Sequence, residues 1–83
     1  MNPSEINAAL YDGQSSRELF DALAEELSRR LGYRVVVDKV ANRYLVMRVA
    51  ETTQLLEQEL MAAVDPLGFL AQTVQMRTSQ ARG

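Results

Sequence analysis

The side chains that most often carry catalysis are largely missing from this chain. Among its 83 residues there is no histidine and no cysteine. That composition removes the commonest general base, the two best zinc ligands and the Ser-His and Cys-His nucleophile pairs. The four glycines are scattered and form no phosphate-binding loop, and the carboxylates lack the spacing of a calcium-binding loop. The sequence therefore predicts a protein that is not an enzyme and needs neither a metal nor a cofactor.

Two short runs of side chains that could take part in catalysis are explained by helix formation instead. Glu25 and Glu26 are neighbours in a predicted helix, where successive side chains point about 100° apart and do not converge on one reacting atom. Ser15 stands three residues before Glu18, which is the capping-box spacing that begins a helix. We therefore expect a solvated charged face at the first pair and a helix cap at the second.

Positive charge is concentrated in the middle of the chain. Residues 29–48 contain six basic residues and one acidic residue, whereas the rest of the chain contains three basic and ten acidic residues. The formal net charge is −2 and the isoelectric point is about 5.0, far below the value above about 9 that is usual for nucleic-acid-binding domains. The basic segment is therefore a candidate surface for an acidic protein partner before it is one for nucleic acid.

The basic segment coincides with a predicted β-hairpin. In residues 33–49 the side chains alternate between two faces with the period of two that strands show. A three-residue loop at residues 40–42, with Asn42 in the left-handed conformation, would pair Lys39 with Arg43. A four-residue loop is the alternative, and it shifts the register.

The three-residue loop divides the hairpin into two faces. One face is assigned to the core and carries Tyr33, Val35, Val37, Leu45, Met47 and Val49. The other is the predicted partner-binding site, because it combines exposed valines with the Tyr and Arg side chains that are enriched in interface hot spots. The residues of this face are Arg34, Val36, Tyr44, Val46 and Arg48, and the predicted site also includes Arg43 next to the loop. A slip of one residue in the register would exchange the two faces.

Two helices are predicted before the hairpin. Asn2 as the N-cap and proline at the next position favour a helix over residues 3–11. Apolar residues at helical spacing after Ser15 predict a second, longer helix. Gly32 should end that helix, because glycine adopts the left-handed cap conformation without steric cost.

The part of the chain after the hairpin is less regular. A third helix is expected to begin at Thr52 or Thr53 and to end before Pro66, because the residue preceding proline disfavours helical geometry. Residues 67–77 fit both a helix and a strand, with the helix slightly favoured. Residues 78–83 are expected to form a flexible tail.

These elements predict a single α+β domain over residues 1–83, with a two-stranded antiparallel hairpin packed against helices. The predicted function is that of a non-enzymatic protein–protein interaction module, such as an adaptor, a regulator or an assembly subunit. It would bind an acidic partner or a second copy of itself, and a homodimer is expected. Nucleic-acid binding by the basic hairpin is the alternative. No membrane partner or small-molecule substrate is indicated, and the lack of cysteine suits a reducing compartment such as the cytoplasm.

Overall fold

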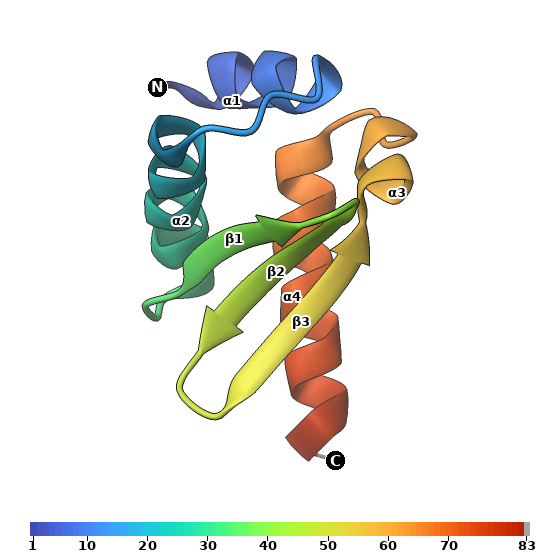
Figure 1. Cartoon of the computed structure of the whole chain (residues 1–83). Helices are drawn as coiled ribbons and strands as arrows, with labels where there is room; N and C mark the ends of the chain where they lie inside the picture. The colour runs from blue at the N-terminus through green and yellow to red at the C-terminus, as the bar shows by residue number, and fades with distance from the viewer. Residues whose placement is uncertain (83) are drawn as a thin grey trace.

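The computed structural model describes the backbone of residues 1–82 and the side chains of residues 1–77. It confirms the α+β class (Figure 1). The elements in chain order are α1 (Pro3–Tyr11), α2 (Arg17–Leu31), β1 (Val36–Val40), β2 (Arg43–Arg48), β3 (Glu51–Leu56), α3 (Glu57–Met61) and α4 (Pro66–Arg82). The strands form one antiparallel sheet in the order β1-β2-β3, and α4 passes behind this sheet in Figure 1.

The first helix begins as the sequence predicts. The Glu5 amide donates to Asn2 Oδ1 at 2.9 Å, and the Asn2 amide donates to Glu5 Oε1 at 3.0 Å. This reciprocal capping box satisfies two amides that have no partner within the helix. Ile6, Ala9 and Leu10 are buried on one side of α1, so the short helix is stabilised by docking as well as by its cap.

The second helix starts one residue later than predicted. Its N-cap is Ser16, whose Oγ accepts a hydrogen bond from the Leu19 amide at 3.1 Å. The predicted cap, Ser15, instead accepts a hydrogen bond from Lys39 Nζ at 3.2 Å. The predicted end is confirmed, since Gly32 occupies the left-handed region at φ 82°.

A third strand replaces the first part of the predicted third helix. Residues from Thr52 onward belong to β3, and only the short α3 follows. Thr52 and Thr53 are β-branched and suit a strand. Leu55 lies opposite Tyr44 of β2 and is 2% exposed. Pairing with β2 thus outweighs the local helical pattern, and the predicted two-stranded hairpin is corrected to a three-stranded sheet.

Pro66, before which the third helix was predicted to end, is the first residue of the last helix, α4. Asp65 caps α4, since its Oδ1 accepts from the Gly68 amide at 3.2 Å and from Asn7 Nδ2 at 2.8 Å. These hydrogen bonds, that from Asn7 above all, lower the pKa of the Asp65 carboxyl. The ambiguous residues 67–77 are therefore helical, as favoured. The backbone of α4 continues to Arg82. The flexible tail predicted for residues 78–83 stays a prediction, because the side chains from residue 78 onward and Gly83 lie outside the described residues.

The core lies between the helices and one face of the sheet. Val37, Tyr44 and Val46 point inward from β1 and β2, and each is at most 2% exposed. The helices contribute Leu23, Leu27, Leu60, Leu67 and Leu70, which are at most 1% exposed. Burial of this kind contributes roughly 1.5–3 kcal/mol per large side chain, so the sheet depends on the helices for its stability.

The turn between β1 and β2 has two residues, Ala41 and Asn42, because Val40 pairs with Arg43. The sequence predicted the left-handed conformation for Asn42, but the structure assigns it to Ala41, whose φ is 56°. A Cβ atom in this region costs about 1–2 kcal/mol, partly offset by the greater entropy of glycine in the unfolded chain.

We therefore expect Ala41→Gly to raise the free energy of unfolding by about 0.5–1 kcal/mol. Urea denaturation monitored by circular dichroism would measure the change. The matched control is Asn42→Gly, which is expected to lower stability because Asn42 is not among the residues with positive φ. The opposite order of the two variants would contradict the observed turn.

Candidate functional site

The two-residue turn changes which residues of β2 face the core. Val36 lies opposite Met47 and Val37 opposite Val46, one residue away from the predicted pairing. A shift of one residue moves every side chain of a strand to the other face. Tyr44 and Val46 were predicted to be exposed for partner binding, but they are 1% and 2% exposed. Their placement on the outer face is therefore wrong.

The other predicted site residues are distributed over three places. Val36, which is 54% exposed, and Arg43 point away from the helices. Arg34 precedes β1 and borders a depression beside α2. The Arg48 guanidinium lies 4.0 Å from the centre of the Tyr33 ring, a cation–π contact. The structure thus places Val36 and Arg43 on the same sheet face but in separate rows, with Val36 opposite Met47 and Arg43 opposite Val40. Val36 borders the same depression as Arg34. The predicted neighbourhood of Arg34 and Arg48 is wrong, because the register shift of one residue moves Arg48 to the face that carries Tyr44 and Val46.

One face of the sheet is not covered by a helix, and we call it the open sheet face. Strand pairing arranges its outward-pointing side chains in three rows across β1, β2 and β3. The rows are Val36-Met47-Thr52, Asp38-Leu45-Gln54 and Val40-Arg43-Leu56. Val36 and Val40 are 54% and 58% exposed. An apolar surface with one acid and one base is therefore presented to the surroundings.

Sequence reasoning missed most of this surface. Leu45 and Met47 were assigned to the core, and Val40 was assigned to the loop. The signal that would have placed them correctly is the turn length alone, since a two-residue connection pairs Val40 with Arg43 and turns Leu45 outward. Leu56 was missed because β3 was expected to be helical.

The free edge of β1 is protected by side chains. The Val35 amide donates to Ser28 Oγ of α2 at 3.0 Å, and the Lys39 amide donates to Asp38 Oδ1 at 2.8 Å. Unpaired amides on an edge strand would otherwise be available to pair with a strand of another chain. Strand addition at β1 would have to break these hydrogen bonds.

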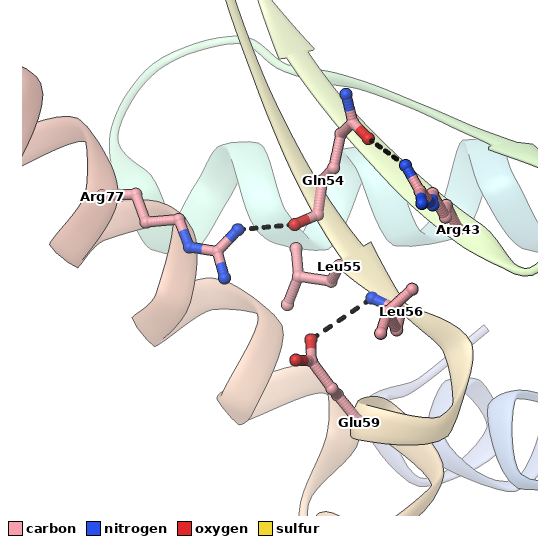
Figure 2. A pocket seen from close by; sticks show the side chains of 6 residues that line it. All are labelled: Arg43, Gln54, Leu55, Leu56, Glu59 and Arg77. Atoms are coloured by element: carbon pink, nitrogen blue, oxygen red, sulfur yellow. Dashed lines mark hydrogen bonds between the residues drawn. The ribbon is translucent and has the colours of Figure 1, made fainter.

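The opposite edge, on β3, is protected in the same way. Figure 2 shows Arg77 of α4 reaching the backbone of β3, where its Nη1 donates to the Gln54 carbonyl oxygen at 2.5 Å. The Leu56 amide donates to Glu59 Oε2 at 3.3 Å in the same view. A shallow depression at this edge is lined by Arg77, Gln54 and Arg43. Arg43 donates to the Gln54 side chain at 3.4 Å. Backbone groups at both edges of the sheet are thus hydrogen-bonded to side chains, whereas the open sheet face is uncovered.

A half-buried polar cluster ties the end of β1 to α3. Lys39 Nζ forms an ion pair with Glu57 and lies 5.2 Å from the centre of the Tyr44 ring. The hydrogen bond that Lys39 donates to Glu57 raises the pKa of the Lys39 ammonium, and burial raises the pKa of the Tyr44 hydroxyl. A lysine that retains its proton is neither a nucleophile nor a general base at neutral pH. The cluster is therefore suited to holding elements together and not to catalysis.

Other kinds of site were sought in the part of the chain that the structure describes. It contains no group of three or more side chains able to hold a metal ion. Each helix among these residues is too short or too polar to cross a membrane. No protein-family model matches the chain, and no curated protein or solved structure is significantly similar to it. The open sheet face is thus the candidate site that the structure itself supplies.

Proposed function

We propose that this chain is a non-enzymatic protein–protein interaction module that docks through the open sheet face. The observation that carries the proposal is an uncovered sheet face centred on Leu45, with Val36 and Val40 more than half exposed. Single exposed apolar residues are common, but a contiguous apolar surface with polar neighbours is typical of a protein contact. The expected compartment is a reducing one, such as the cytoplasm, for a chain without cysteine.

The contact proposed is face to face and not by strand addition. Both sheet edges have backbone groups occupied by side chains, including those of Ser28 and Arg77, so a new strand would lose these hydrogen bonds before gaining its own. The open sheet face loses no intramolecular contact when another surface covers it. Apolar burial there is worth roughly 25 cal/mol per Å² before the costs of association.

Nucleic-acid binding has less support than it has from the sequence alone. Lys39 is paired with Glu57, and Arg48 stacks on Tyr33. Tyr44, the aromatic residue that was available for stacking on bases, is buried. Arg43 is then the basic residue of the open sheet face, which provides little for a phosphate backbone.

The proposal predicts that Leu45→Lys abolishes protein association while the fold is retained. Lysine at this position lies beside Asp38 and remains on an exposed face, so its effect on stability should be small. It replaces the apolar side chain at the centre of the proposed contact with a charged one, which would have to be desolvated on association. Sedimentation equilibrium would report self-association, and affinity capture would report other protein partners.

The matched control is Val64→Lys, because Val64 is 97% exposed and lies between α3 and α4, away from the strands. This variant should associate like the wild type. Association that survives Leu45→Lys would overturn the proposal. A wild-type chain that remains monomeric and captures no protein would overturn it as well.

A further inference from the structure

The open sheet face carries one acid and one base around a central leucine. Asp38 of β1 lies directly beside Leu45, and Arg43 lies two residues from Leu45 along β2. Neighbouring strands are about 4.8 Å apart and alternate residues of a strand about 6.6 Å apart. The two opposite charges therefore flank Leu45 at similar distances and in perpendicular directions. The face as a whole has no excess charge that would select a strongly acidic partner.

We infer that the partner of the open sheet face is a second copy of this chain, with the strands of the two copies crossing at about 90°; this inference rests on the proposed docking function. A two-fold axis through Leu45, close to the diagonal from Val40 to Thr52, produces this crossing. It places Asp38 of each copy over Arg43 of the other. Such an isologous contact uses the same surface twice and closes at two subunits.

The same axis matches the apolar side chains. Leu45 meets Leu45 of the other copy, and Val40 meets Val40 of the other copy. Val36 lies at the corner related by symmetry to Leu56, so these two side chains also meet. Orthogonal packing is one of the two arrangements in which sheets stack face to face, with inward side chains forming a layer about 10 Å thick.

Other two-fold axes through Leu45 do not match the charges. An axis parallel to the strands would place Arg43 on Arg43 of the other copy. An axis perpendicular to the strands would place Asp38 on Asp38 of the other copy. Like charges that face each other directly are destabilising. A two-fold axis along the remaining diagonal, from Val36 to Leu56, leaves both charged side chains opposite neutral residues. Only the axis near the diagonal from Val40 to Thr52 therefore places an acid opposite a base at both positions.

The size of the face indicates a weak dimer. Three strands and five to six residues per strand cover about 14 × 18 Å, which is well below the roughly 800 Å² per partner of a standard stable interface. A dissociation constant in the micromolar range or above is expected, as for other small interfaces. Self-association should therefore be measured over a concentration series that extends to about 1 mM.

The test is an exchange of charge between the two positions. Asp38→Arg and Arg43→Asp each create two like-charge contacts per dimer, and each should weaken self-association at least about tenfold. A mixture of the two variants should restore association, because each Arg at position 38 then meets an Asp at position 43 and the reverse. One variant would be labelled with a fluorophore at its N-terminus and titrated with the other. Fluorescence anisotropy would then measure the affinity of the mixed dimer. Circular dichroism and thermal melts verify the folds.

The mixture distinguishes this geometry from a folding defect, because two variants damaged independently would not recover on mixing. The doubly exchanged variant, Asp38→Arg with Arg43→Asp, should also self-associate near wild-type strength. Two single variants that dimerise like the wild type would overturn the inference, as would a mixture that stays monomeric. If Leu45→Lys still removes a contact with a different protein, the proposed docking function stands and only the second copy as partner is excluded.

Discussion

Replacing Tyr44 with alanine is expected to lower the free energy of unfolding by about 3–5 kcal/mol, the usual cost of deleting a large buried aromatic side chain. Tyr44 is 1% exposed and packs edge-on against Phe20, with ring centres 6.5 Å apart and planes at 85°. It also lies opposite Leu55 across the sheet. Because a domain of this length has a total stability of roughly 4–12 kcal/mol, the variant should be partly unfolded or close to it. Urea denaturation would measure the loss.

Tyr44→Phe is the matched control. The Tyr44 hydroxyl is buried and has no hydrogen-bond partner among the described residues. Its removal should leave stability unchanged or raise it by up to about 1 kcal/mol, since an unsatisfied buried hydroxyl is itself a cost. If Tyr44→Ala were fully stable but deficient in association, Tyr44 would be a surface residue, and the observed register of β2 would be contradicted.

Raising the pH above about 10, where free lysine and tyrosine side chains titrate, is expected to reduce stability. Hydrogen bonding to Glu57 raises the pKa of Lys39, and burial raises the pKa of Tyr44. In both cases the folded state holds its proton at a pH at which the unfolded chain releases it. The contribution of these groups is fully present below their unfolded pKa values and is lost as the pH rises through the folded ones.

Two variants separate the contributions of Tyr44 and Lys39 to the loss of stability at high pH. Tyr44→Phe removes the tyrosine part and should flatten the pH dependence. Glu57→Gln removes the main cause of the Lys39 shift, and it should also cost about 1–2 kcal/mol at neutral pH, because a charged hydrogen bond at a half-buried site is lost. Chemical denaturation repeated from neutral to alkaline pH would measure both. A wild-type stability that does not fall above pH 10 would contradict the assignment.

The elements predicted correctly are those that local chemistry determines. The Asn2 N-cap and the left-handed Gly32 need only neighbouring residues to form, so their signals are visible in the sequence. The strand β3 depends on Leu55 meeting Tyr44, which lies eleven residues earlier in the chain. Since the same residues also fit a helix, no local pattern distinguishes the two outcomes.

The candidate site was predicted in the correct segment but partly on the wrong face. Val36 and Arg43 are on the open sheet face, whereas Tyr44 and Val46 are in the core. The difference arises at Ala41, which adopts a positive φ although alanine disfavours it. Asn42 beside it was the better candidate by intrinsic preference. The pairing of the whole hairpin therefore follows from packing of the core, which overrides the preference of one turn residue.

The occupied edges of the sheet also determine how this protein behaves when it is concentrated. Fibrils grow by adding strand after strand to an edge whose amides and carbonyls are unpaired. Here Ser28 and Asp38 occupy amides of one edge, while Arg77 and Glu59 occupy groups of the other. Strand addition at either edge must first break these hydrogen bonds, so crowding favours reversible and finite association over open-ended polymerisation.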